Sequence, residues 1–383
     1  MCFQNATYTD IPAVLPADGD TIRRWILDRF KHAQESLIQL LSTIQTRVHF
    51  TFDLWTSPNH RAFLGVIGHW VDNQGKLHST VLGLRRFRGR HTGENQAIHF
   101  WEVATRYKLV DKIGYFTLDN ATNNDSALRF VKNYLGEIGI PFDPVARRLR
   151  CFGHVINLVV KAFLWGEDAE VFEAEIITCA DLEKEVEELQ GWRKKGPLGK
   201  LHNVLTWICR TPQRRDRFEE KVRQNNRGLA VKALSLIRGN STRWGGDYDS
   251  LTRAFELRES IEEFVSAAIR RNQDGERDNT QPHALLHDEL NSQDWNILRD
   301  IMDILQPFRK WQLMLQGRQH YGQLHDILPA MDELLTHLED TRQGFDTSER
   351  RNATKHIRTA LDTAWSLLNK YFRYFINIQL LHI

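Results

Sequence analysis

The sequence predicts an α/β core, a mixed sheet flanked by helices, followed by a large all-α region. Alternating apolar and polar residues between positions 48 and 87 have the two-residue period of three half-buried strands, two of them joined by a polar link that contains glycine. Positions 92–165 alternate helical and strand patterns, which is typical of a sheet whose later strands are connected by helices. Beyond Trp165 only helical periodicity remains.

Each element of the core has a local signal. A helix is predicted from Thr21 to Thr43, because Asp18 or Asp20 can cap it and its apolar residues recur every three or four positions. We expect this apolar face to dock on the sheet that follows. The later elements are predicted at Val48–Leu54, Phe63–Val71 and Leu77–Phe87 (strands), Thr92–Tyr107 (helix), Tyr115–Leu118 (strand), Asn123–Ile138 (helix), Arg147–Phe152 (strand) and Val155–Trp165 (helix).

The second half of the chain is predicted to be helical. It begins with an acidic stretch, Asp168 to Glu188, which is typical of a solvated helix face or a connector. The sequence therefore divides into an irregular segment (1–17), a helix with the core (18–167) and a helical domain (168–383). The helices of this domain are predicted at Leu198–Arg210, Arg215–Gln224, Tyr248–Arg271, Ser292–Leu315, Gly322–Asp340 and Glu349–Phe375.

Composition excludes several classes of protein. With 41% hydrophobic and 26% charged residues, the 383-residue chain is typical of globular rather than disordered material. No apolar run approaches the length of a membrane span, and the N-terminus lacks the basic start and apolar core of a signal peptide. The four cysteines have no paired spacing, which indicates a reducing compartment, so we expect a cytosolic or nuclear protein.

Two strands of the core end in an aspartate. Asp53 closes the alternating segment that begins at Val48, and Asp119 follows the strand from Tyr115 in the same way. A single aspartate at a strand end more often only caps a turn. Two in similar contexts point instead to paired carboxylates at one edge of the sheet. Hard divalent cations prefer such oxygen ligands, and these cations can support phosphoryl transfer.

A third cluster, Arg147–His154, has three arginines followed by a Cys-x-x-His motif where a strand should meet a helix. A Cys-x-x-His motif can supply half of a zinc site, but no second Cys/His pair lies nearby and His202 and Cys209 are poorly spaced as partners, so structural zinc is not expected. Phosphate contact is one interpretation, because Arg150, His154 and the amides of a helix start favour anions. Packing of the cysteine and histidine at the junction is the other, and the residues alone favour it slightly.

The densest basic run of the chain lies between Arg210 and Arg227 and includes Arg214, Arg215 and Arg217. It supplies a local positive charge that the net charge of +2 conceals. Such runs are usually solvated faces, but this one lies between two other segments suited to DNA contact.

Glycines flank Arg243 and Trp244, which predicts that both side chains are presented on an irregular segment rather than packed in a helix. An arginine beside an aromatic ring can neutralise a phosphate while the ring stacks on an unpaired base. Anchoring of a loop to the core by Trp244 is equally compatible with the composition.

Together these segments resemble the hAT family of DNA transposases, in the forms common in fungal genomes. The resemblance implies an RNase H-like core interrupted by a helical insertion, in line with the change from mixed to helical patterns. It extends from about Thr21 to Leu368. The segments that carry it, in order, are Phe52–Ser57, Leu118–Asp125, Arg150–Leu158, Leu198–Asn203 with Thr211–Arg215, and Thr242–Trp244.

The resemblance also implies roles for individual residues. Asp53 and Asp119 match the first two carboxylates of the family's metal site. His154 matches a residue near the scissile phosphate, and Trp244 matches one that stabilises an extrahelical base. The implied reaction takes place in the nucleus: water, and then a 3′-hydroxyl, attacks phosphodiesters at transposon ends with the assistance of Mg²⁺ or Mn²⁺.

Two features of the family are missing from the sequence. No Cys/His cluster precedes Thr21 as a zinc finger, and Tyr371–Ile383 does not resemble the region that holds the third carboxylate, a glutamate. We therefore expect a truncated transposase-like chain that binds DNA, holds its metal weakly and has little or no strand-transfer activity. A homo-oligomer is expected only of a full-length relative, and no membrane contact is expected. The alternative is a non-catalytic nucleic-acid-binding relic or domesticated protein.

Overall fold

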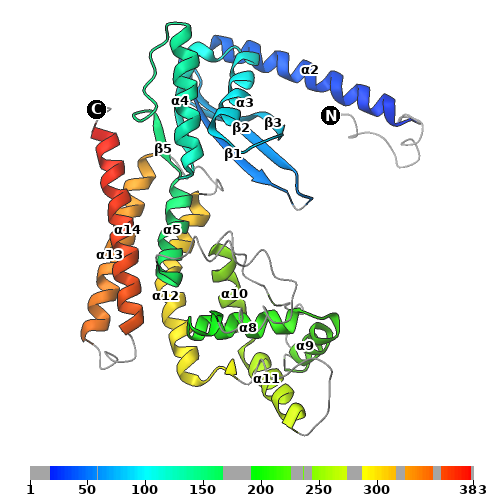
Figure 1. The fold of residues 1–383 in the computed structure, drawn as a ribbon, viewed down its shortest axis with the longest axis vertical. Coiled ribbons are helices and arrows are strands. Elements are labelled where there is room, and N and C mark those ends of the chain that lie inside the picture. Colours follow the sequence, from blue (N-terminus) through cyan, green and yellow to red (C-terminus); the bar gives the residue numbers. More distant parts are fainter. Residues whose placement is uncertain are drawn as a thin grey trace. The chain divides into compact units, whose positions relative to one another are not determined.

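The computed structural model describes residues 18–57, 59–166, 191–225, 236, 244–273, 287–315, 324–347 and 355–380. The chain divides into two compact units, Met1–Cys151 and Phe152–Ile383 (Figure 1). The division lies before the helix Phe152–Trp165, which the sequence analysis placed in the core domain and which contributes to an apolar core of the second unit. The acidic stretch before Glu188 lies outside the described residues.

The first unit contains the predicted mixed sheet, so this part of the fold prediction is confirmed. The strands lie in the order β3-β2-β1-β4-β5. β1, β2 and β3 are antiparallel, whereas β4 and β5 run parallel to β1. The strands are β1 (Val48–Thr56), β2 (Ala62–Val71), β3 (Leu77–Phe87), β4 (Ile113–Leu118) and β5 (Arg148–Arg150).

One face of the sheet is covered by α3 (Gly93–Arg106) and α4 (Thr122–Glu137), which also pack against each other. Phe50 of β1, Phe100 of α3 and Phe116 of β4 are buried between these helices and the sheet. The ring centroids of Phe50 and Phe100 are 4.9 Å apart, and those of Phe100 and Phe116 are 5.1 Å apart. The strand residues that alternate with these core positions face the other side of the sheet, where most are only half-buried.

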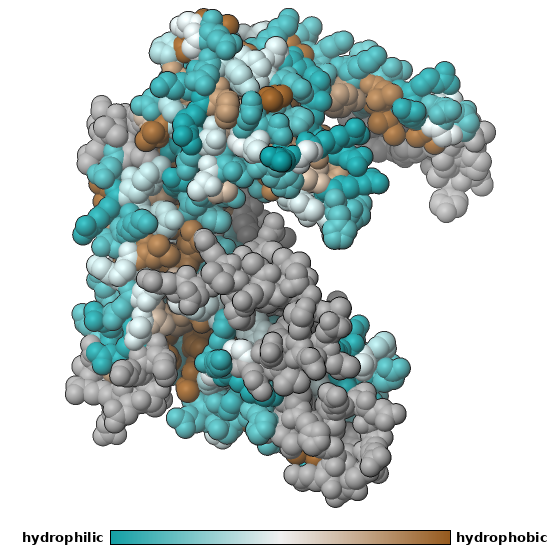
Figure 2. Space-filling model, viewed as in Figure 1, coloured by the Kyte–Doolittle hydropathy of each residue, from teal (hydrophilic) through white to brown (hydrophobic). Residues whose placement is uncertain are grey.

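Helix α2 (Gly19–Thr43) forms as predicted, and the Asp18 carboxylate accepts a hydrogen bond from the Thr21 amide at 2.7 Å. The prediction that its apolar face docks on the sheet is wrong for most of its length, because only residues near its C-terminal end, such as Leu41, enter the core. Periodicity shows that a helix has an apolar face but not what covers that face. The exposed apolar residues, several of them visible as brown atoms in Figure 2, are Ile22, Trp25, Ile26, Leu27, Phe30 and Leu40.

The second unit is helical, as predicted. α5, α13 and α14 share one apolar core with the later part of α12, while α8 to α11 share another with its first part. In the described part of the chain, no helix has the length and apolar character needed to cross a membrane. The helices are α5 (Phe152–Trp165), α8 (Pro197–Cys209), α9 (Pro212–Asn225), α10 (Trp244–Glu256), α11 (Arg258–Gln273), α12 (Ser292–Leu315), α13 (Leu324–Thr347) and α14 (Lys355–Leu380).

The single helix predicted over Tyr248–Arg271 is instead two helices, α10 and α11, which meet at the buried Leu257. The prediction missed this break because the apolar residues keep helical spacing through it. These residues are Leu251, Ala254, Leu257, Ile261 and Phe264. The helix starts predicted at Gly322 and Glu349 lie outside the described residues.

Candidate functional site

The two aspartates belong to neighbouring parallel strands: Asp53 lies within β1, three residues before its end, and Asp119 directly follows β4. The last pair in the register of these strands is Phe50 with Phe116, three residues before Asp53 and Asp119 respectively. Both positions have the parity of the half-buried face rather than that of the core. Adjacent strands are about 4.8 Å apart, which allows two carboxylates to reach one cation. Asp53 and Asp119 thus follow the last paired residues of neighbouring strands by the same number of positions, and their pairing in one site stays a prediction.

Asp119 is oriented by the start of α4. Its Oδ1 atom accepts hydrogen bonds from the Asn124 side-chain amide at 2.5 Å and from the Ala121 backbone amide at 3.0 Å. Asn124 is itself buried, so its amide is a fixed donor. These two bonds point Oδ1 at the protein and leave Oδ2 for another ligand. Asp53, by contrast, is exposed.

Strand β5 attaches to the loop that carries Asp119. The Arg148 guanidinium is buried, forms an ion pair with Asp125, and donates a hydrogen bond to the Asp119 carbonyl at 2.6 Å. Arg150 is partly exposed and its Nη2 lies 3.7 Å from the same Asp125 carboxylate. Arg148 therefore positions the loop, while Arg150 retains surface for a phosphate beside it.

Cys151 and His154 fall on either side of the unit boundary. Cys151 follows β5 and its amide donates to the Leu118 carbonyl at 2.8 Å, whereas His154 lies in the first turn of α5 in the second unit. Both are partly buried. Among the described residues, no group of three or more His, Cys, Asp or Glu side chains is arranged to hold a metal ion.

The basic run forms α9, where it divides between two faces. Arg214 is buried, its guanidinium carbon lies 4.3 Å from the centroid of the Trp207 ring, and its Nη1 donates to the Trp207 carbonyl at 3.2 Å. The expectation of an exposed, DNA-facing Arg214 is therefore wrong, because its four-residue spacing from Phe218 places it on the inner face of the helix. Arg215 and Arg217 are exposed, as a DNA contact requires.

Trp244 lies in the first turn of α10 and not on an irregular segment, which corrects the prediction from its flanking glycines. Gly245 also lies in this helix, and a Cβ atom there would require the side-chain ends of Arg309 and Gln312 on α12 to shift. The placement of the Trp244 side chain and of Arg243 lies outside the described residues.

Two histidines lie on the same sheet face as Asp53, and the sequence analysis did not single them out. His49 and His69 are cross-strand partners on β1 and β2. His49 Nδ1 accepts a hydrogen bond from the Tyr115 amide at 3.1 Å, and His69 Nε2 lies 3.1 Å from the Thr51 hydroxyl. Burial lowers the pKa of both rings, and for His49 the charges of His69 and nearby arginines add to the effect.

These histidines predict acid sensitivity of the first unit. Their folded-state pKa values lie below the unfolded value of about 6.5, so the unfolded chain binds more protons and stability falls as pH drops below that value. Urea titrations of the full chain between pH 8 and 5, about three pH units around the reference pKa, should show this loss. The double variant His49→Asn, His69→Gln keeps polar groups in place and should flatten the profile; an unchanged profile would contradict the assignment.

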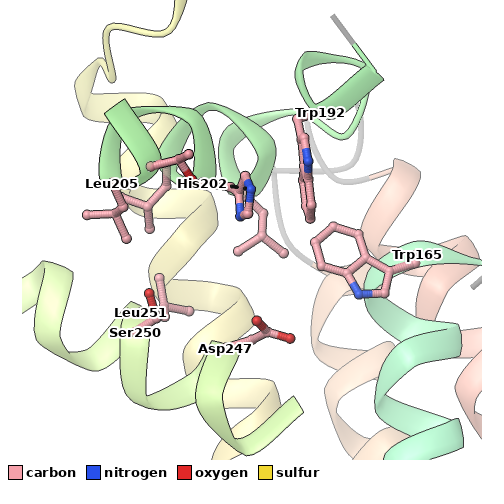
Figure 3. Close-up of a pocket in the computed structure, with 10 residues that line it drawn as sticks. Trp165, Trp192, His202, Leu205, Asp247, Ser250 and Leu251 are labelled. Carbon is pink, nitrogen blue, oxygen red and sulfur yellow. Dashed lines mark hydrogen bonds between the residues drawn. The ribbon is translucent and has the colours of Figure 1, made fainter. Parts of the chain in front are cut away.

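A small cavity in the second unit also escaped sequence analysis, because its walls come from distant segments. Its volume is about 40 Å³ and its polar lining includes His202 and Asp247 (Figure 3). The rings of Trp165 and Trp192 meet edge to face with centroids 5.2 Å apart, and Trp192 stacks on His202 at 3.7 Å. The residues that line the cavity come from α5, the segment before α8, α8 and α10. They are too far apart in the sequence for any spacing to show that they meet.

Comparison with known proteins agrees with this architecture. Residues 51–139, which include Asp53 and Asp119, match the family model of the ZBED1 RNase-like domain. The Zea mays protein named "Putative AC transposase" is 29% identical over 143 residues, which make up 37% of this chain and 18% of that protein.

The similarity also extends beyond the core. A Talaromyces stipitatus protein named "Putative transcriptional regulator tpeD" is 24% identical over 345 residues, or 90% of this chain and 38% of its own length. The RICESLEEPER 2 protein of Oryza sativa subsp. japonica, whose name includes a BED zinc finger domain, is 22% identical over 152 residues, 39% of this chain and 21% of that protein. The chain thus spans less than two fifths of the length of these relatives.

Proposed function

We propose, from the premise that this chain is an hAT transposase-like protein with an RNase-like core, that its first unit carries a divalent-cation site for phosphodiester chemistry on DNA. The observation that supports the proposal is that β1 and β4 are parallel neighbours whose last register pair, Phe50 with Phe116, precedes Asp53 and Asp119 by three residues each. Relatives named as transposases and as a transcriptional regulator support DNA as the partner and the nucleus as the location.

The donor set fits a hard cation. Two carboxylates from adjacent strands offer the oxygen ligands that Mg²⁺ and Mn²⁺ prefer. In Asp119 the hydrogen bonds from the protein go to Oδ1, so Oδ2 is the oxygen that would bind the ion. When bound, such an ion would polarise a phosphate and activate the attacking oxygen. Asp53 and Asp119 would hold it, while Asn124 and Arg148 keep the Asp119 loop in place.

Three glutamates of the second unit, Glu289, Glu333 and Glu339, have partners within that unit. Glu289 accepts a hydrogen bond from the Ser266 hydroxyl at 2.9 Å, Glu333 pairs with Lys310 at 3.0 Å, and Glu339 accepts from the Trp365 indole at 2.7 Å. We therefore propose a site of two carboxylates, which should bind its cation weakly and have low activity.

The decisive test is metal-dependent nicking of DNA by the full chain. We expect slow nicking with Mn²⁺, weaker nicking with Mg²⁺, and none after Asp53→Asn, because the substitution removes one of two anionic ligands. Mn²⁺ binding measured by electron paramagnetic resonance should weaken at least about tenfold in the same variant, the usual scale for loss of a ligand's support.

Asp72→Asn is the matched control, since Asp72 lies in the β2–β3 turn and pairs with His78. The proposal fails if Asp53→Asn retains the Mn²⁺ affinity of the parent chain, or if both variants lose it equally.

The second candidate function is DNA binding without catalysis. It is favoured by the exposed Arg215 and Arg217, which lie on the outer face of α9. In this case DNA affinity should fall steeply with salt, survive Asp53→Asn, and decrease in the double variant Arg215→Ala, Arg217→Ala with a shallower salt dependence. Arg223→Ala serves as the control, because Arg223 already pairs with Glu219 and Glu220 on the same helix.

A further inference from the structure

The aromatic wall of the cavity in the second unit already holds a cation on one side. The Lys195 ammonium lies 4.3 Å from the centroid of the Trp165 ring and 5.2 Å from that of Trp192. Indole rings attract cations through their negative faces. Burial lowers the pKa of Lys195 to about 8, because the ammonium group has lost much of its hydration. The two indole rings contact it in place of water. Lys195 does not line the cavity itself.

The facing wall carries a carboxylate. Asp247 projects from the first turn of α10 and its carboxylate points toward Trp165 (Figure 3). Within the described part of the chain, this carboxylate makes no hydrogen bond or close ion pair. Burial raises the pKa of Asp247 to about 7, and the charge of Lys161, buried on α5, opposes that rise only in part. Positive charge within the protein therefore compensates this carboxylate only in part.

We infer that this cavity binds the head of an organic ammonium ion, a primary or methylated alkylammonium group, between the Trp165 ring and the Asp247 carboxylate. The ring supplies attraction to a soft cation, and the carboxylate supplies the opposite charge. A cavity of about 40 Å³ admits a few waters or an ammonium head. The inference is independent of the metal and DNA chemistry proposed above.

Binding should depend on pH through Asp247. Tetramethylammonium has a fixed charge, so its affinity should rise between pH 6 and 8, about one unit either side of neutrality, as the carboxylate loses its proton. The other groups facing this region are Lys195 against the Trp165 ring, Lys161 of α5, His202 of α8, and the Asp249–Arg309 pair between α10 and α12. Asp249 Oδ2 and Arg309 Nη2 pair with each other at 2.7 Å. Asp247 is therefore the carboxylate that can pair with a bound cation.

The test is ligand-observed NMR on the full chain with tetramethylammonium and n-butylammonium, and with tert-butanol as the neutral probe of similar shape. We expect the ammonium ions to bind at least about tenfold more tightly than tert-butanol, since a desolvated cation–π contact with a carboxylate provides that much. Equal binding of tert-butanol would overturn the inference without need of any variant.

Two substitutions on one helix then locate the site. Asp247→Asn should weaken tetramethylammonium binding at least about tenfold and remove its pH dependence, whereas Asp249→Asn should leave both unchanged. Far-UV circular dichroism checks that each variant folds. Unchanged affinity in Asp247→Asn would exclude this cavity.

The natural source of the ammonium group is distinguished by peptides. A peptide with trimethyllysine that binds more tightly than free tetramethylammonium identifies a polypeptide side chain as the source. Equal affinities identify a free amine. Failure of both to bind overturns the inference.

Discussion

Replacing Gly93 with alanine is expected to destabilise the first unit by about 3 kcal/mol. Gly93 opens α3 where that helix crosses α4, and a Cβ atom there would lie 2.5 Å from the Asn123 carbonyl oxygen and 2.6 Å from the Ala127 amide nitrogen. Backbone atoms cannot rotate away, so the start of α4 must shift. Because Asn124 from this turn holds Asp119, metal affinity should fall along with stability.

Gly136 provides the matched control for this prediction. It lies in α4, is exposed, and has nothing within 4 Å of an added Cβ. Gly136→Ala should therefore stabilise the unit by up to about 1 kcal/mol through helix propensity alone. Urea unfolding followed by circular dichroism measures both variants. Shifts of the same sign would contradict the close contact of α3 and α4.

Arg193→Met is expected to destabilise the second unit by about 3–5 kcal/mol. The Asp288 carboxylate is buried and receives two hydrogen bonds from Arg193, both at 2.8 Å, with a third from Asn203 at 3.2 Å. Without the guanidinium, a buried negative charge loses its counter-charge. Thermal unfolding by calorimetry should show a lower midpoint for this unit.

The control is an ion pair of similar length on the surface. Arg342 and Asp362 are 2.9 Å apart, but both side chains are about half exposed. Arg342→Met should cost less than about 1 kcal/mol, because water screens the pair. If both variants lose the same free energy of unfolding, the burial of Asp288 does not determine how much stability its ion pair provides.

The sequence predicted elements better than it predicted what they contact. Helix α12, Ser292–Leu315, begins and ends as expected, because its apolar stripe is long and regular. The stripe of α2 is equally regular, yet Trp25 and Phe30 are exposed. Local periodicity records which residues share a face, whereas docking depends on contacts with residues distant in the sequence.

The candidate site shows the same limit. The sequence singled out Asp53 and Asp119 because the patterns of strand and turn around them are local signals, although β1 continues past Asp53 to Thr56. Other features depend on packing between segments that are distant in the sequence, and no sequence spacing encodes them. They are the register of β1 and β4, the burial of Arg214, and the grouping of Trp165, Trp192 and Asp247.

The exposed portion of α2 has a consequence for hydrogen exchange. Only the last turns of the helix share the core of the first unit, so the turns around Trp25 have little tertiary packing to keep their amides closed. Isolated helical turns open readily. Amide protection along α2 should therefore rise from Gly19 toward Leu41, from local fraying at one end to exchange limited by unfolding of the whole unit at the other.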